Sequence, residues 1–489
     1  MGIAIPFDNS YARLPKAFHA PIAPKALAAP RTVKVNHALA DDLGIDPTSL
    51  ETEEGAAVLA GARAAAGSEP IALVYAGHQF GQFVPRLGDG RALLLGEVID
   101  HHGQRRDLQL KGSGITPYSR QGDGLAALGP VLREYLVSEA MHALGVPTTR
   151  SLAIVTTGES VYRETELTGA VLTRVAASHI RVGTFQYFAA RGEDENLRAL
   201  ADHAIARHEP DALGAPDRYR LFLEGVARRQ GVLIARWMLL GFVHGVMNTD
   251  NMAVSGETID YGPCAFLDRY DPATVFSSID RGGRYAYGNQ PAIGQWNVAR
   301  LAECLLPLLS EVEAEAMEQA TGALSIYAET FNTTYREGLL AKIGLPGGDE
   351  RDWALADDLL TIMKAGKADF TATFRGLASL AAGANGENVG AGFRDPAAFT
   401  AWVGAWRERI VEKHLDTQAV AAAIRAANPA FVPRNQRVEE VIAAAVQNED
   451  FAPFEAFLAV LMRPYDDQPE ASRWADPGPA APYRTFCGT

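Results

Sequence analysis

The sequence contains few cysteines for its length. Its 489 residues include only Cys264, Cys304 and Cys487. Three thiols cannot form a disulfide framework, which excludes the class of disulfide-stapled secreted domains and favours a reducing, cytoplasmic compartment. The first residues, "MGIAIPFDNS", agree, because they lack the basic segment and following apolar run of a secretion signal.

Long hydrophobic runs and an excess of positive charge are also absent. The longest apolar stretch, residues 231–247, is too short to cross a bilayer and contains Arg236 and His244, so it predicts a buried helix. The formal net charge is −14. That balance excludes general binding to nucleic acid or to an anionic membrane. A phosphate-binding site would therefore need locally clustered arginines and lysines.

Apolar residues are plentiful, at 47%, and the texture of the chain changes along its length. Residues 1–65 form a mixed extension, and residues 66–190 alternate short β-prone runs with glycine turns around one helix. Residues 191–345 follow helical periodicity, and residues 346–489 contain further amphipathic helices and a proline-rich tail. The pattern predicts an α+β protein whose strand-rich part binds a nucleotide and whose later parts are helical.

One stretch nearly matches the catalytic core of a protein kinase. "HGVMNTDNMAVSGETIDYGP", residues 244–263, follows the kinase pattern H-R-D-x-x-x-x-N and D-F-G. Asn251 occupies the asparagine position, and Asp260 begins the D-x-G triplet. The position of the catalytic aspartate holds Val246, which can accept no proton. The stretch therefore predicts a kinase-like site that lacks the usual base.

The carboxylate and amide groups of this stretch suggest a metal site and a substitute base. Kinases bind Mg²⁺ through residues at the positions of Asn251 and Asp260, and oxygen ligands suit Mg²⁺ or Mn²⁺. The alternative for Asp260 is an ordinary Asp-x-Gly turn. The intervening residues 252–259 read as a β-hairpin. Asp250 is either the general base or a cap for nearby backbone amides.

A lysine and a glutamate upstream complete the kinase order. Lys111 ends the apolar strand "LQLK", and Glu134 lies on the helix "GPVLREYLVSEAMHALG", with Pro130 in its first turn and Gly145 as its cap. In kinases such a pair positions a phosphate. The alternative is an ordinary surface salt bridge.

Glycines and arginines supply the remaining candidate contacts to phosphate. In "RLGDGR" and "RQGDGL", glycine permits a close approach of backbone amides, although each could be only a hairpin turn. In "LTRVAASHIRVG" two arginines are seven residues apart, which would place them on one face of a helix, where they suit a triphosphate or are merely solvated. The candidate residues are Gly88, Gly90, Arg91, Asp123, Gly124, Arg174 and Arg181.

The sequence closely resembles the selenoprotein O family over nearly its whole length. The segments that carry the resemblance are long and specific. They are "YAGHQFGQFVPRLGDGRA", "LQLKGSGITPYSRQGDGLAALGPVLREYLVSEAMHALGVPTTRSLA", "GFVHGVMNTDNMAVSGETIDYGP", "RYAYGNQPAIGQWNVARLAE" and "NQRVEEVIAAA".

The resemblance implies a bilobal protein-kinase-like fold and the activity of a protein adenylyltransferase. Such an enzyme binds ATP in a flipped orientation and transfers AMP to a Ser, Thr or Tyr hydroxyl of a protein, with release of pyrophosphate. The implied base is Asp250, the metal ligands are Asn251 and Asp260, and Glu134 is the partner of Lys111. The implied nucleotide contacts are Gly88, Gly90, Arg91, Lys111, Asp123, Gly124, Arg174, Arg181 and Asp260.

Two alternatives and one departure remain. The chain could instead be a conventional kinase or a nucleotide-binding pseudokinase scaffold, although the intact set of polar residues argues against an inactive site. The family is named for a selenocysteine near the C-terminus, and Cys487 occupies that place here. Cys487 is either an inert tail residue or a redox-active thiol. Cys264 is its expected partner because it follows the D-x-G triplet.

Overall fold

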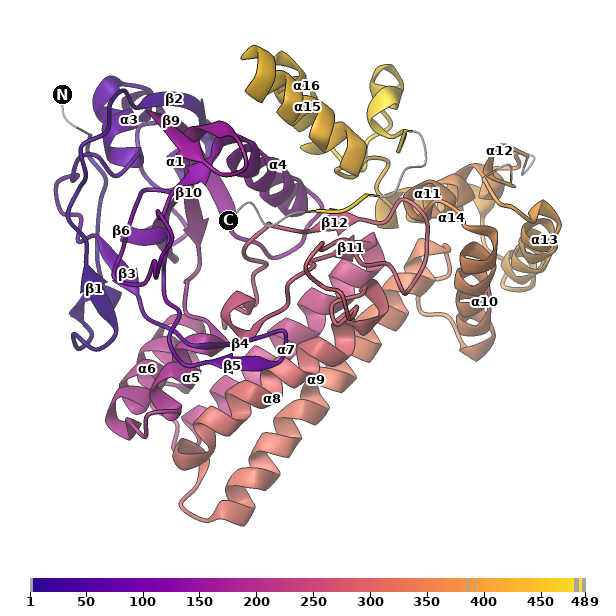
Figure 1. Ribbon diagram of the computed structural model, residues 1–489. Helices are drawn as coiled ribbons and strands as arrows, with labels where there is room; N and C mark the ends of the chain where they lie inside the picture. The colour runs from indigo at the N-terminus through magenta and orange to yellow at the C-terminus, as the bar shows by residue number, and fades with distance from the viewer. Residues whose placement is uncertain (1–2, 385–386, 391, 479–482, 486–489) are drawn as a thin grey trace.

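The computed structural model describes residues 3–384, 387–390, 392–478 and 483–485. Figure 1 shows the strands gathered in the N-terminal part of the molecule and the helices filling the rest. The fold is therefore mixed α and β, as the sequence predicts. None of the helices in these ranges combines the length and the apolar character that a membrane span requires.

The N-terminal part is built on an antiparallel sheet whose strands differ in length. The strand order is β1-β3-β6-β7-β10-β9-β2, with β8 paired to β10. Its central strands β6 and β7 are almost wholly buried, as expected for the apolar runs "ALLLGEVI" and "LQLK". A separate hairpin, β4–β5, lies beyond this sheet. The bounds are β1 His19–Pro21, β2 Arg31–Val35, β3 Ile71–Leu73, β4 Gly77–Gln79, β5 Gln82–Val84, β6 Ala92–Ile99, β7 Arg105–Lys111, β8 Ala126–Ala127, β9 Arg150–Tyr162 and β10 Glu166–Ala176.

Helices cover the sheet on both sides. Apolar residues of the short N-terminal helices pack with Leu108 and Leu110 of β7, whereas α4 packs with Ile154 and Leu172 of β9 and β10. Helix α4 contains Pro130 in its first turn, and Gly145 follows its end at φ 79°. The sequence placed both boundaries of this helix correctly. The bounds are α1 His37–Asp42, α2 Pro47–Leu50, α3 Glu53–Leu59 and α4 Leu128–Ala143.

Long helices form the second part of the molecule. The stretch predicted to be a buried helix lies largely in α7, which is a single helix that ends at Gly241 with φ 71°. Strand β11 follows it and pairs with β12. The kinase-like stretch lies largely between these two strands and includes the short helix η3, Thr249–Asn251. The bounds are α5 Val182–Ala189, α6 Asp194–His208, α7 Arg218–Leu240, α8 Gln290–Leu309, α9 Glu313–Lys342, β11 Phe242–Val243 and β12 Ala265–Phe266.

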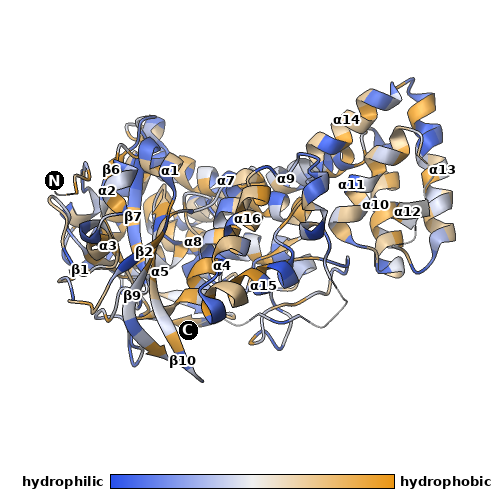
Figure 2. Cartoon of the chain, turned by 90° about the horizontal axis from the view of Figure 1, so that it is seen from above, coloured by the Kyte–Doolittle hydropathy of each residue, from blue (hydrophilic) through white to orange (hydrophobic). Residues whose placement is uncertain are grey.

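The remaining helices divide into two groups. Figure 2 shows α10, α11, α13 and α14 at the end opposite the N-terminal strands, each with hydrophilic and hydrophobic residues along its length. Helices α15 and α16 instead return to pack on α4. The bounds are α10 Glu350–Gly366, α11 Phe370–Ala381, α12 Glu387–Gly390, α13 Pro396–Glu412, α14 Thr417–Ala427, α15 Asn435–Asn448 and α16 Ala452–Leu461.

The hairpin predicted for residues 252–259 is wrong. This segment forms no strand pair with itself. Instead, Ala253 bridges to Arg181 and Thr258 bridges to Thr148. The segment is therefore held by the parts of the chain that precede helix α5 and strand β9, because its apolar residues are buried against them.

Candidate active site

The centre of the candidate site is an ion-pair network of four side chains. The ammonium of Lys111, at the end of β7, lies 2.7 Å from Glu134 Oε2 on α4 and 2.6 Å from Asp260 Oδ1. Arg174 on β10 donates to Glu134 Oε1 at 2.5 Å and also to Asp260 Oδ1. Lys111, Glu134 and Arg174 are all buried. This is a balanced internal cluster and not an ordinary surface salt bridge.

The two carboxylates of this network are ionised. Burial opposes ionisation of Asp260, but the charges of Lys111 and Arg174 hold its pKa well below the usual range. Burial also opposes ionisation of Glu134, and Arg174 and then Lys111 lower its pKa. Asp260 has φ 68°, a left-handed conformation that non-glycine residues seldom adopt, although aspartate adopts it more readily than most.

Asp250 lies in helix η3 and has a different environment. Its side chain is buried, and burial raises its pKa to about 6 against the opposing charge of Arg181. Arg181 Nη1 donates to the backbone carbonyl of Asp250 at 2.9 Å. Asp250 Oδ1 has no hydrogen-bond partner in the described part of the chain. A buried carboxylate with one unpartnered oxygen suits a proton acceptor better than a loop cap.

The β4–β5 hairpin holds the Asp250 carboxylate from the other side. Gln79 Nε2 donates to Asp250 Oδ2 at 3.3 Å. Gly77, on the same strand, lies so close that a Cβ there would overlap Asp250 Oδ1. Only glycine therefore leaves room for the carboxylate at this position. Neither residue could be assigned to the site from the "AGHQFGQF" segment alone, because only the fold brings them to residue 250.

Backbone amides of the same hairpin fix the residues that precede Asp250. The amide of His78 donates to Thr249 Oγ1 at 2.7 Å, and the amide of Phe80 donates to Asn248 Oδ1 at 3.0 Å. The hydroxyl of Tyr285 donates to the same Asn248 oxygen at 2.6 Å. Hairpin and catalytic stretch are thus joined residue by residue, which limits the positions that Asp250 can occupy.

The first glycine segment lies where the sequence predicts, directly before β6. Gly88 has φ 93°, and a Cβ there would lie 2.5 Å from the ring of Tyr118. Gly90 and Arg91 follow it, and all three line the same cleft as Asp250. Backbone amides at such a turn can approach a bound phosphate closely.

The second glycine segment also reaches the cleft, but its carboxylate is already paired. Arg163 donates two hydrogen bonds to the Asp123 carboxylate, of 2.7 and 3.0 Å. Gly124 follows at φ 69°. Asp123 and Gly124 line the cleft beside Arg163, so the pair forms part of its wall.

The prediction that Arg174 and Arg181 share one face of a helix is wrong. Arg174 belongs to strand β10, and Arg181 is the residue before helix α5. Arg181 stacks on Tyr75 at 4.5 Å and lies 3.6 Å from Asp89 Oδ1. Arg174 reaches the site from the strand through Glu134 and Asp260, and Arg181 reaches it from the start of the helix beside Asp89.

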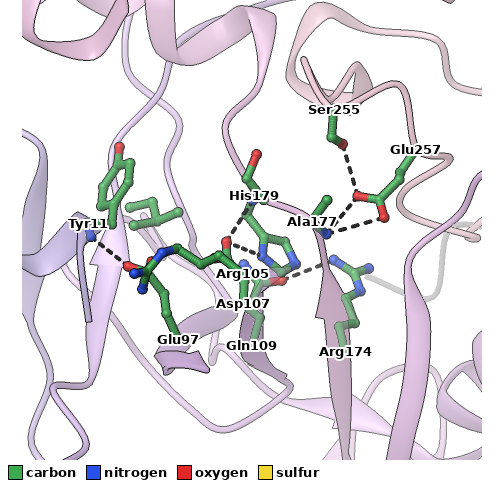
Figure 3. A network of polar contacts seen from close by, with 12 residues as sticks. Tyr11, Glu97, Arg105, Asp107, Gln109, Arg174, Ala177, His179, Ser255 and Glu257 are labelled. Atoms are coloured by element: carbon green, nitrogen blue, oxygen red, sulfur yellow. Dashed lines mark hydrogen bonds and ion pairs between the residues drawn. The ribbon is translucent and has the colours of Figure 1, made fainter. Parts of the chain in front are cut away.

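A polar network continues behind Arg174, as Figure 3 shows. Arg174 Nη1 donates to Gln109 Oε1 at 3.3 Å. Further back, Asp107 Oδ2 accepts from the amide of His179 at 2.8 Å. Burial first opposes ionisation of Asp107, but the charge of Arg207 lowers its pKa. The ion pairs and hydrogen bonds of this buried network hold strand β7 in place behind the site.

Asn251 and Asp260 fit the oxygen ligands of a divalent cation. Both line the cleft. Asn251 Nδ2 donates to the carbonyl of Val246 at 3.0 Å, which leaves its amide oxygen as the group available to a metal. Asp260 uses Oδ1 for its cations, and its other oxygen has no ion pair among the described residues. The described residues contain no group of three or more His, Cys, Asp or Glu side chains arranged to hold a metal, so water and phosphate oxygens would have to complete the coordination.

The cleft that unites these groups has a volume of about 680 Å³. That volume lies within the usual range for a small-molecule or cofactor site. Lys111 and Glu134 line a neighbouring pocket of about 480 Å³, which shares Arg91 with the cleft, and Arg174 is buried. The residues from the predicted set that line the cleft are Gly88, Gly90, Arg91, Asp123, Gly124, Arg181, Asp250, Asn251 and Asp260.

The predicted cysteine pair is only partly described. Cys487 lies outside the described residues. Cys264 is fully buried, and burial raises the pKa of its thiol to about 11. Its neighbour Pro263 accepts a hydrogen bond of 2.6 Å from the hydroxyl of Thr485. The described part of the tail therefore lies against the segment that follows the D-x-G triplet.

A strand-end lysine paired to a helix glutamate, beside a carboxylate and amide cleft, resembles the arrangement that positions phosphates in group-transfer enzymes. The family described as "Protein adenylyltransferase SelO" matches residues 2–462. This chain belongs to that family.

Curated relatives match the chain from end to end. A protein of Methylorubrum extorquens is 62% identical and one of Bradyrhizobium diazoefficiens is 58% identical, each with 100% of both chains covered. A protein of Rhizobium rhizogenes is 59% identical, with 99% of this chain and 97% of the relative covered. All three are named "Protein nucleotidyltransferase YdiU".

Proposed function

We propose that this chain transfers AMP from ATP to a Ser, Thr or Tyr hydroxyl of a protein and releases pyrophosphate. Membership of the SelO family and the names of the relatives support nucleotidyl transfer to protein. The division into a strand-rich lobe, residues 66–190, and a helical lobe, residues 191–345, in a kinase-like arrangement is part of the proposal, as is a cytoplasmic location.

The observation that carries the proposal is the contrast between Val246 and Asp250. Val246 stands at the kinase base position and contributes only apolar surface to the cleft. Four residues later, Asp250 offers a carboxylate whose pKa is raised to about 6 by burial. A base with this pKa is mostly deprotonated at neutral pH and can still accept a proton in the transition state. The chemistry is therefore displaced from the kinase position to Asp250.

The cationic side chains would neutralise the phosphates. Lys111, Arg174 and Arg181 converge on Asp260, whose pKa each of them lowers. With the nucleotide in the flipped orientation, arginines near the outer phosphates would stabilise the charge that develops on pyrophosphate. The other proposed nucleotide contacts are Gly88, Gly90, Arg91, Asp123 and Gly124.

Asn251 and Asp260 would hold Mg²⁺ or Mn²⁺. When bound, the cation would neutralise charge on the phosphates and orient them. Lys111 keeps Asp260 in place on one side, and the Val246 carbonyl keeps Asn251 in place on the other.

In the proposed step the hydroxyl oxygen of the acceptor attacks the α-phosphorus of ATP. The new bond joins that oxygen to the α-phosphorus, and the bond from the α-phosphorus to the oxygen bridging it to the β-phosphorus breaks. Asp250 takes the hydroxyl proton, and pyrophosphate leaves with the bridging oxygen and its electron pair. Gln79 holds the carboxylate in the orientation needed for proton transfer.

The test follows whether the α- or the γ-phosphate of ATP reaches the acceptor protein. Incubation of the chain with a protein acceptor, Mg²⁺ or Mn²⁺, and ATP labelled at the α or the γ position should leave only α label on protein, and mass spectrometry should find added AMP. Incorporation of γ label alone would indicate the kinase alternative. Binding of ATP with incorporation of neither label, into the acceptor or the chain itself, would indicate the pseudokinase alternative.

A further inference from the structure

Two arginines and one tryptophan form a cationic surface beside the β4–β5 hairpin. The guanidinium carbons of Arg284 and Arg300 lie 4.8 and 4.9 Å from the ring centre of Trp296. His78, on the hairpin, meets the same indole edge-on at 5.3 Å. All four side chains are partly exposed. We call Arg284, Trp296 and Arg300 the arginine–tryptophan patch.

The positive charge of the patch is not fully compensated. Arg300 pairs with Glu303 at 2.5 Å, but Arg284 has no carboxylate within ion-pair distance among the residues that the structure describes. The nearby Asp280 carboxylate accepts from the backbone amides of residues 284 and 285 instead. The Nε atoms of both arginines are buried without a hydrogen-bond partner in the described chain. An arginine without an ion-pair partner, beside a second arginine, stands out in a chain with net charge −14.

The patch is joined to the proposed base through the hairpin. A Cβ on Gly81, at the hairpin turn, would lie 3.5 Å from the guanidinium carbon of Arg284. The same hairpin carries Gln79, which bonds to Asp250. Tyr285, next to Arg284, donates to Asn248 just before the base. The β4–β5 hairpin thus contacts the patch through its turn and Asp250 through Gln79.

The surroundings suit a polypeptide better than a second part of the nucleotide. None of the three patch residues is among the described residues that line the cleft, whereas Ile279, 56% exposed, does line it. The ring of Phe83, 40% exposed, lies tilted against His78 with the ring centres 5.0 Å apart. Exposed apolar and aromatic side chains beside a cationic surface are features of surfaces that bind other proteins.

We propose that the arginine–tryptophan patch docks an acidic segment of the acceptor protein, and so positions a nearby hydroxyl at Asp250. Guanidinium groups bind carboxylates through paired hydrogen bonds, and the shared indole holds both arginines in place. The inference rests on the proposed function and adds a substrate class to it: hydroxyls that lie close in sequence to Asp or Glu.

The test uses two fluorescent peptides that share one serine and differ only in the flanking residues, Glu in one and Gln in the other. Binding to the full chain is measured by anisotropy, and AMP transfer is measured separately. The acidic peptide should bind the wild type more tightly than its Gln counterpart. The double variant Arg284→Gln/Arg300→Gln should lose about tenfold of that affinity, with the KM for ATP unchanged.

Arg336→Gln is the matched control, because Arg336 stacks on Trp353 at 5.3 Å in the distant helical part. It should leave binding of both peptides unchanged. Equal binding of the two peptides to the wild type would overturn the proposal, as would a rise in the KM for ATP without loss of peptide affinity. If the acidic peptide binds in an arginine-dependent manner but no protein or peptide ever receives AMP, the docking surface stands and the proposed transfer activity fails.

Discussion

Lys111 and Asp260 are paired at 2.6 Å, although 149 residues separate them in the chain. The contact joins the end of the central strand β7 to the D-x-G triplet near the end of the kinase-like stretch. The same ammonium also holds Glu134. Lys111, like Arg174, therefore links helix α4 to a proposed metal ligand.

Replacing Lys111 by alanine should reduce AMP transfer by about 10² to 10³-fold, because a preorganised charge at the phosphates is lost. Turnover with saturating ATP and metal checks this, with circular dichroism to verify folding. Lys34→Ala is the control, since Lys34 forms an ion pair of the same length with Glu455, away from the cleft. Turnover within twofold of wild type would contradict a phosphate clamp at Lys111.

Asp260→Ala should abolish metal-dependent binding of ATP. The change removes a proposed ligand and also leaves Lys111 and Arg174 without one of their carboxylates. Calorimetric titration with ATP, with and without Mg²⁺ or Mn²⁺, measures the effect. Asp260→Asn keeps the shape of the side chain and should show the same loss of metal dependence. Unchanged metal-dependent affinity in both variants would rule out this ligand assignment.

Asp250→Asn should lower kcat strongly while ATP binding persists, because an amide cannot accept the hydroxyl proton. Since burial raises the pKa of Asp250 to about 6, the deprotonated base is present above that pH. Transfer by the wild type should therefore fall as the pH decreases through about 6. The pH dependence of kcat, measured with excess metal and ATP, tests the assignment. A flat profile between pH 5 and 8 would argue for another proton acceptor.

Gln79→Ala should lower kcat less than Asp250→Asn does, with little effect on the KM for ATP. The glutamine does not react; it orients the carboxylate through one hydrogen bond. Gln82→Ala is the matched control on the exposed strand of the same hairpin. A large rise in the KM for ATP, with kcat unchanged, would instead assign Gln79 to nucleotide binding.

The order of motifs along the sequence was sufficient to predict the central ion pair. A lysine at the end of an apolar strand, a glutamate on the next helix and a D-x-G triplet were each ambiguous alone, but their order implied the pairing of Lys111 with Glu134 that the structure shows. The second contact of Lys111, with Asp260, was not predicted. Arg174 joined the predicted set for the wrong reason. Its spacing from Arg181 matched a helix, whereas a strand and a turn separate them.

The role of the β4–β5 hairpin could not be predicted from local pattern. Gln79 and Asp250 are 171 residues apart, and no periodicity or turn signal relates them. The same limit explains the error over residues 252–259, whose alternating residues satisfied a hairpin pattern but whose pairing partners lie elsewhere in the chain. Long-range packing decides such cases, because local propensity is weak compared with burial.

Cys487 should confer sensitivity to reductant without taking part in transfer. The described tail already contacts the segment beside Cys264 through Thr485 and Pro263. Cys264 is fully buried with its pKa raised to about 11, so its reaction should be slow and require local opening. AMP transfer is compared with and without reductant in wild type, in Cys487→Ser and in the buried-thiol control Cys304→Ser. A response that persists in Cys487→Ser would exclude the tail thiol as its source.

Lys342→Met should stabilise the protein at neutral pH. Lys342 is 3% exposed, its ammonium lies 4.3 Å from the ring centre of Phe374, and no carboxylate among the described residues pairs with it. Burial lowers its pKa from 10.5 to about 7. Between these values the unfolded chain binds the proton and the folded chain does not, so this residue makes the free energy of unfolding rise with pH across that window.

The stabilisation by Lys342→Met should therefore be greatest near pH 7 and below, on the order of a few kcal/mol, and should shrink as the pH approaches 10. Urea unfolding of wild type and variant at pH 6.5, 8 and 9.5 measures the difference. Lys364→Met, at an exposed position of helix α10, should show no comparable change with pH. A stability difference for Lys342→Met that stayed constant with pH would mean that the lysine keeps its proton in the folded protein, and that the two aromatic rings of Phe370 and Phe374 are sufficient to hold the charge.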